Sequence, residues 1–241
     1  MDTDFRRPAA SWFEDLPADR LLVEMSLWSA DLGRIEPDMQ RVEAGTDIFH
    51  IDVSDGHFTP AILYFPDLVA RLRRVTARPF HVHLMVDDAV LESQIEQFAE
   101  AGADLISIHA ENADTSARLA QIRRLGLKAG IALKLGTPVA AAAPYIAQTD
   151  MLTLLGTRLG VKGQSLAPEA PARLRAAQAL VAAQAGGRRV VLAADGGIRE
   201  VTVPVLRGAG AQTVVMGSLA FGAPDFAARI AWARGLARAV P

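Results

Sequence analysis

Two histidines and two aspartates stand in or at the ends of short apolar runs of this chain. His50 and Asp52 are two positions apart, so on a strand both side chains point to the same face. His83 lies in the run HVHLMV, and Asp195 ends the run VVLAAD. Imidazole and carboxylate groups bind hard or borderline divalent metal ions and also transfer protons. If the runs end at one edge of the fold, these four residues predict a metal site with room for substrate oxygens.

The elements that must position these residues alternate regularly. Short β-branched runs are followed by longer segments that are rich in Ala, Leu and Arg and have helical spacing. The runs are nearly continuously apolar, as in strands that helices cover. Eight such units with no β-hairpin signal predict an α/β fold, the closed (β/α)8 TIM barrel, whose C-terminal strand ends meet at the active-site face. We expect the strands at 22–28, 48–54, 80–86, 104–109, 128–134, 150–156, 190–195 and 213–217.

The chain is interpreted as one domain with a short N-terminal extension. No linker-like stretch divides residues 21–241, which we assign to the barrel, and residues 1–20 form the extension. Ser11 is the expected N-cap of one or two helical turns there. Trp12 and Phe13 could pack locally, cover the lower end of the barrel or join a subunit interface.

The composition excludes several classes of protein. None of the 241 residues is Cys, which excludes disulfides and thiolate metal sites. The net charge of −2 is spread over both signs, so we expect no nucleic-acid partner. No apolar run has the length of a membrane span, and the first residues lack the apolar core of a signal peptide. We therefore expect no membrane partner and a cytoplasmic location.

Five motifs occur in the order of a known family. The segments MSLWSAD, HIDVSDGHF, HLMV, ADGGI and GSLAFGAPD resemble those of the ribulose-phosphate 3-epimerase family, over roughly residues 22–235. The combination of HIDVSDGHF with HLMV is the most specific part. The resemblance implies a barrel of the ribulose-phosphate-binding type, a small phosphorylated sugar as substrate, and a homo-oligomer.

The resemblance also assigns roles to residues. It implies that His50, Asp52, His83 and Asp195 hold a divalent metal ion, for which Zn, Fe, Mn and Co remain open, and that Ser26 contacts the substrate. Asp52 and Asp195 would also be the acid/base pair. Epimerisation beside a ketone removes a proton on one face and returns one on the other, which two carboxylates can do if one starts ionised and the other protonated. The metal would stabilise the charge of the enediolate that forms.

Glycines follow the seventh and eighth expected strands. Gly196 and Gly197 follow the seventh, and Gly217 and Ser218 follow the eighth. Loops after these two strands that lead into helix N-termini are the common phosphate site of barrels. We therefore predict that these residues bind the substrate phosphate.

The substrate pocket departs from the family pattern. The loop after the sixth strand retains Gly160 and Gly163, which we expect to contact the substrate. Met85 is also expected to contact it, whereas Leu155 and Ser54 replace two other methionines. These changes predict the same proton chemistry on a ketose phosphate that could be a tetrulose, pentulose or hexulose phosphate.

The loops also bring Lys134, Arg158 and Lys162 to the predicted mouth of the site, where they could contact substrate or stay solvated. Lys134 leaves a Schiff-base aldolase or lyase of the same barrel class open as an alternative. A catalytically silent phosphate-binding barrel is a further alternative. His81 and His109 are expected to be hydrogen-bonded core residues.

Overall fold

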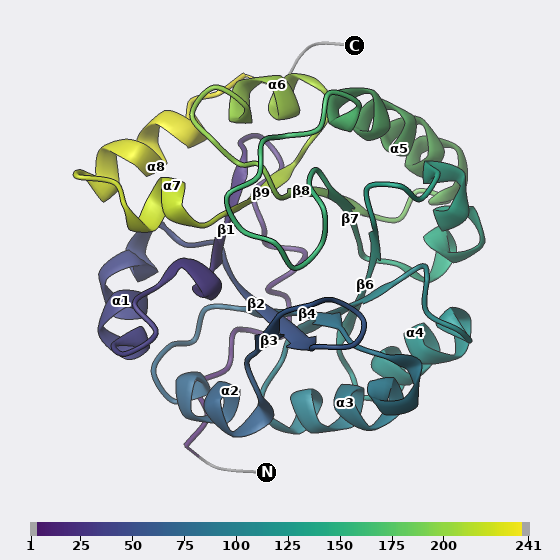
Figure 1. The fold of residues 1–241 in the computed structure, drawn as a ribbon, viewed down its shortest axis with the longest axis horizontal. Coiled ribbons are helices and arrows are strands. Elements are labelled where there is room, and N and C mark those ends of the chain that lie inside the picture. Colours follow the sequence, from purple (N-terminus) through teal and green to yellow (C-terminus); the bar gives the residue numbers. More distant parts are fainter. Residues whose placement is uncertain (1–3, 238–241) are drawn as a thin grey trace.

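Eight parallel strands close into a barrel in the computed structural model, which describes residues 4–237. Each strand pairs with the next, and the last returns to pair with the first, as Figure 1 shows in a view along the barrel. This confirms the predicted (β/α)8 fold, and the strands begin within one residue of the expected positions. The strands are β1 (Leu22–Ser26), β2 (Ile48–Asp55), β4 (Phe80–Met85), β5 (Leu105–His109), β6 (Lys128–Leu133), β7 (Met151–Leu155), β8 (Val191–Asp195) and β9 (Thr213–Met216).

Helices form a ring around the barrel (Figure 1). In α3, Leu91, Ile95 and Phe98 recur at helical spacing and are buried, and Asp87 caps the first turn by accepting from the Ala89 N–H. The α-helices are α1 (Ile35–Val42), α2 (Pro66–Arg73), α3 (Asp88–Glu100), α4 (Thr115–Arg124), α5 (Ala170–Gln184), α6 (Val203–Gly208), α7 (Ser218–Phe221) and α8 (Phe226–Arg234); the 3-10 helices are η1 (Leu27–Ser29), η2 (Glu43–Gly45) and η3 (Val139–Gln148).

Two local features differ from the sequence-based expectation. The segment η3 is a 3-10 helix that contains Pro144, which has no N–H to donate to an α-helical ladder. A two-residue strand, β3 (Ile62–Leu63), pairs antiparallel with the end of β2. The hairpin was missed because its second strand is only two residues long.

The register of the strands places the chemically active side chains in adjacent positions. His50 pairs with Ser26 of β1 and with His81 of β4, and Asp52 pairs with His83. Alternate residues of a barrel strand face the interior, so these pairings put the side chains in neighbouring layers of one interior.

The N-terminal segment covers the lower end of the barrel. Phe13 and Leu16 are buried against Leu22, Ile48, Leu105, Met151 and Val191, which are the first residues of their strands, and Trp12 packs on the same cluster. Covering of the lower end is therefore confirmed. Residues 4–20 form turns, bends and irregular backbone rather than a helix, and the predicted N-cap is wrong, because the Ser11 hydroxyl donates to the Asp15 carboxylate instead.

Within residues 4–237, no helix is long and apolar enough to cross a membrane.

Candidate active site

The four predicted metal ligands meet at the C-terminal ends of three strands. His50 and Asp52 lie on β2, His83 on β4, and Asp195 ends β8; one ligand atom from each lies within 4.8 Å of all the others. His50 Nε2 is 3.3 Å and His83 Nδ1 is 3.6 Å from Asp52 Oδ1, and His83 Nδ1 is 3.9 Å from Asp195 Oδ2. The barrel thus brings together residues that are up to 145 positions apart.

The free nitrogens of this cluster fit a divalent metal ion. His50 Nε2 and His83 Nδ1 are buried and have no hydrogen-bond partner among the described residues. The other nitrogen of each ring is hydrogen-bonded away from the cluster, to Glu24 and to His109 respectively. Each ring therefore turns one lone pair toward the two carboxylates. Two imidazole nitrogens and two carboxylates together form a donor set that suits Zn²⁺ and similar ions.

Glu24 of β1 is a part of the site that the sequence-based prediction missed. Its side chain is fully buried, and its Oε2 accepts from His50 Nδ1 at 2.9 Å and from His81 Nδ1 at 2.7 Å. His81 Nε2 in turn lies 2.6 Å from the Ser107 hydroxyl. A charged residue in the apolar run LLVEMS was the available signal, but its partners depend on the cross-strand register.

A second chain of hydrogen bonds runs outward from His83. Its Nε2 is 2.9 Å from His109 Nε2, and His109 Nδ1 is 3.1 Å from Glu111 Oε2. Because a carboxylate only accepts, His109 donates from Nδ1 and accepts at Nε2 from His83. Both His81 and His109 are therefore hydrogen-bonded interior residues, as expected, although they contact the cluster rather than an apolar core.

The two carboxylates of the cluster have widely separated pKa values. Burial raises the pKa of Asp195 to about 6, and the nearby Asp52 carboxylate adds to this effect. Burial also opposes ionisation of Asp52, but the positive charge of protonated His50 and hydrogen bonding from His50 and His83 outweigh it and hold the pKa of Asp52 well below its usual range. A bound metal ion would take the place of the proton on His50 Nε2. The pair therefore has one firmly ionised member and one that binds a proton near neutral pH.

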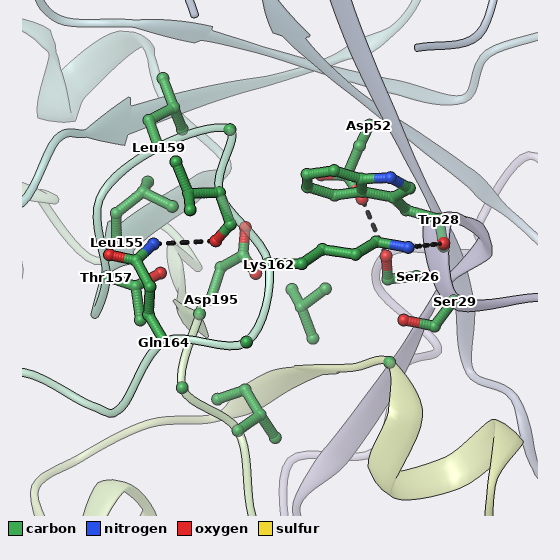
Figure 2. Close-up of a pocket in the computed structure, with 18 of the residues that line it drawn as sticks. Ser26, Trp28, Ser29, Asp52, Leu155, Thr157, Leu159, Lys162, Gln164 and Asp195 are labelled. Atoms are coloured by element: carbon green, nitrogen blue, oxygen red, sulfur yellow. Dashed lines mark hydrogen bonds between the residues drawn. The ribbon is translucent and has the colours of Figure 1, made fainter. Parts of the chain in front are cut away.

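A cavity of about 330 Å³ lies above the carboxylate pair (Figure 2). The Ser26 hydroxyl, at its floor, donates to Asp52 Oδ2 at 2.8 Å. Leu155 also lines the cavity, whereas the Ser54 hydroxyl donates to the Ala61 carbonyl in the β2–β3 hairpin. All the residues predicted to contact substrate or phosphate line the cavity, namely Ser26, Met85, Gly160, Gly163, Gly196, Gly197, Gly217 and Ser218.

Backbone geometry explains the glycines after β8. Gly196 and Gly197 have φ of +85° and +70°, a region that favours glycine. A Cβ on Gly197 would also lie 2.7 Å from the Leu166 Cα, so the loop after β7 packs directly on this turn. Bare backbone therefore faces the cavity at the position where the phosphate was predicted.

The loop after β7 carries cations into the cavity. Arg158 and Lys162 line it, and Lys162 Nζ donates to the Trp28 carbonyl and lies 4.8 Å from the centroid of the Trp28 ring. Figure 2 shows the Lys162 side chain extending across the pocket toward Trp28. Lys134 Nζ lies 3.5 Å from the centroid of the Phe58 ring, and Lys134 is not among the residues that line the cavity. The geometry does not support Lys134 as a Schiff-base amine.

Comparison with protein families decides the membership of the chain. The model of the ribulose-phosphate 3 epimerase family matches residues 22–221. The chain belongs to the ribulose-phosphate 3 epimerase family. The match contains β1 to β9 and therefore all four residues of the His/Asp cluster and the glycines of the cavity.

Relatives in this family are similar over nearly their whole length. The ribulose-phosphate 3-epimerase of Synechocystis sp. is 36% identical over 225 residues, which cover 92% of this chain and 96% of that protein. The ribulose-phosphate 3-epimerase of Bacillus subtilis is 34% identical over 88% of this chain and 98% of its own.

Solved structures share the fold. A 3-hexulose-6-phosphate synthase has a TM-score of 0.64 at 18% identity, covering 90% of this chain and 99% of its own. A 3-keto-L-gulonate-6-phosphate decarboxylase from Vibrio cholerae has a TM-score of 0.65 at 15% identity, covering 89% of this chain and 99% of its own. At this level of identity the likeness concerns the barrel alone.

Proposed function

We propose that this chain is an isomerase that interconverts D-ribulose 5-phosphate and D-xylulose 5-phosphate by epimerisation at C3. Membership in the ribulose-phosphate 3 epimerase family supports the reaction class. The observation that carries the proposal is the convergence of an ionised Asp52 and a proton-binding Asp195 from two separate strands of the barrel.

In the proposed reaction, the Asp52 carboxylate takes the proton from C3 on one face of the substrate, which becomes an enediolate. The protonated Asp195 then returns a proton to C3 on the other face, so the exchange ends with Asp52 protonated and Asp195 ionised. The reverse reaction uses the pair in the opposite order. The Ser26 hydroxyl, bonded to Asp52 Oδ2, fixes the orientation of this carboxylate.

The donor set supports a divalent ion, Zn²⁺, Fe²⁺, Mn²⁺ or Co²⁺, held by His50, Asp52, His83 and Asp195. When bound, the ion supplies positive charge that stabilises the oxygens of the enediolate. We place the substrate phosphate against the backbone of the glycines after β8 and β9, because Gly196, Gly197 and Gly217 line the cavity without a side chain of their own.

Solvent exchange tests this proposal. Asp52→Asn and Asp195→Asn are each expected to abolish conversion of D-ribulose 5-phosphate to D-xylulose 5-phosphate, followed by NMR in D₂O, and Asp52→Asn should also abolish incorporation of deuterium at C3 of D-ribulose 5-phosphate, because Asp52 takes that proton. Asp104→Asn is the matched control, because Asp104 is a buried carboxylate on an ion pair with Arg73, outside the cavity. A wild-type rate of epimerisation in either site variant would refute the two-carboxylate scheme.

One observation favours a ketose phosphate other than a pentulose phosphate as a second candidate substrate. Lys162, a cation, lines the cavity. If the loop after β7 selects a different sugar, a tetrulose or hexulose phosphate will exchange its proton beside the ketone faster than the pentulose phosphate. A panel of ketose phosphates in D₂O, compared by kcat/KM, distinguishes these substrates. A Schiff-base aldolase of the same barrel class would instead form an adduct that borohydride traps at Lys134.

A further inference from the structure

Glu24 is a buried carboxylate that takes no part in the proposed proton transfers. It lies on β1, its side chain is fully buried, and it does not line the cavity. Burial of a carboxylate is unfavourable unless hydrogen bonds or charges compensate it. Here a single oxygen, Oε2, accepts from two imidazoles, those of His50 and His81.

The hydrogen bonds dictate which nitrogen of His50 faces the cluster. An ionised carboxylate has no hydrogen to donate, so His50 must carry its hydrogen on Nδ1. The lone pair is then on Nε2, the buried atom that lacks a hydrogen-bond partner and lies 3.3 Å from Asp52 Oδ1. Glu24 thus fixes both the tautomer and the rotation of this ring.

Glu24 is itself held in place from the far side. His81 donates to Glu24 from Nδ1 and accepts from the Ser107 hydroxyl at Nε2. Strand pairing sets His81 opposite His50, and the two rings meet edge to face with centroids 4.6 Å apart. Neither His81 nor Ser107 reaches the cavity, so this brace acts only through Glu24.

We propose that Glu24, braced by His81 and Ser107, is the positioning residue that orients His50 as a metal ligand. The inference rests on the proposed metal site. It assigns to His81 the role of a brace, although that residue also belongs to a second group of ligand-type atoms with Glu24 and His50. The nitrogens of His81 are both engaged in hydrogen bonds, which leaves it no lone pair to offer an ion.

Metal affinity of the purified chain tests the role of Glu24 without using activity. Metal-free wild type, Glu24→Gln and Glu24→Ala are titrated with Co²⁺ and Zn²⁺ against a chromophoric chelator. Loss of a residue that orients a ligand lowers affinity by about 10- to 100-fold. We expect Glu24→Gln to lower the metal affinity by about 10-fold, because its amide oxygen can still accept a hydrogen bond. Glu24→Ala should lower the metal affinity by about 100-fold. The Co²⁺ absorption bands should change with the geometry of His50.

A control separates positioning from loss of stability. Asp104→Asn removes another buried carboxylate, which accepts from Arg73 and from the Phe80 N–H, and should destabilise the fold while leaving Co²⁺ affinity unchanged. In the zinc-loaded protein, where the ion at Nε2 leaves the hydrogen of His50 on Nδ1, ¹H–¹⁵N NMR should show this Nδ1–H protected by its hydrogen bond to Glu24 in the wild type and exchanging faster with solvent in Glu24→Ala.

The outcomes are distinguishable. If wild type binds Co²⁺ and Glu24→Gln binds it with equal affinity and unchanged absorption, Glu24 has no positioning role; this variant decides alone if Glu24→Ala does not fold. If Asp104→Asn loses as much affinity as the Glu24 variants, the effect is one of general stability and the inference is overturned. If wild type itself binds no divalent ion, the proposed metal site fails, and the role of Glu24 fails with it.

Discussion

Truncation of one side chain at the lower end of the barrel should destabilise the whole fold and leave catalysis intact. Phe13 is 2% exposed and packs among the first residues of five strands. Replacing a buried Phe by Ala costs about 3–5 kcal/mol. Lys128 Nζ and Arg189 Cζ lie 5.1 and 5.6 Å from the ring centroid, and each cation adds roughly 0.5–1 kcal/mol. We therefore expect Phe13→Ala to lower the free energy of unfolding by about 4–7 kcal/mol.

Chemical and thermal denaturation measure this loss. For a chain of this size, about 4 kcal/mol corresponds to a fall in Tm of roughly 8–16 °C. Phe65→Ala is the control, since Phe65 is 58% exposed and its removal should change stability by less than about 1 kcal/mol. The cavity is at the opposite end of the strands, so kcat/KM at a temperature where both proteins are folded should match wild type. A loss below about 1 kcal/mol in Phe13→Ala would show that the N-terminal segment is not part of the core.

Three further predictions follow from the site. Complete removal of metal should abolish epimerisation, and Zn²⁺, Fe²⁺, Mn²⁺ or Co²⁺ should restore it; activity that persists in verified metal-free protein removes the ion from the mechanism. Lys162→Met should raise KM about fivefold with a smaller change in kcat, because a partly exposed ion pair with an anionic substrate contributes about 1 kcal/mol; an unchanged KM means that Lys162 does not contact substrate. The metal-free chain should lose stability as pH falls from 6.5 toward 4, because burial lowers the pKa of His81 and of His109 to about 4. In that window the unfolded chain binds more protons than the folded one, so stability rises with pH, by on the order of a few kcal/mol in total. The dependence of unfolding free energy on pH, measured by urea titrations across this range, should be about half as steep in His109→Gln, because His81 still titrates there; a dependence as steep as in the wild type would contradict the assignment.

The barrel and its cluster could be predicted from the sequence because both depend on local patterns. Strand positions follow from apolar runs, and the spacing of His50 and Asp52 fixes their common face. Convergence with His83 and Asp195 then follows from the geometry of any closed parallel barrel. The structure places all four together.

The rest of the site depends on long-range register. Glu24 is a single charged residue in an apolar strand. Its role becomes apparent only from its hydrogen bonds to residues of β2 and β4. The contact between Lys162 and Trp28 joins the loop after β7 to η1, which follows β1, and no local pattern predicts it. Likewise, Ser11 has the composition of an N-cap, but the packing of Phe13 on the barrel leaves the segment as turns.

The distribution of the cluster along the chain has a consequence for how the protein acquires its ion. Asp195 is supplied by β8, which pairs with β7 and β9, so the ligand set is complete only after nearly the entire barrel has closed. A chain emerging from the ribosome with β2 and β4 alone offers two histidines and one carboxylate on an open sheet edge. At the proposed metal site, capture of the ion would therefore be a late event that follows folding, and the folded site would select the ion from those available where synthesis ends. Growth under limitation of one metal should change which ion is recovered without changing the yield of folded protein.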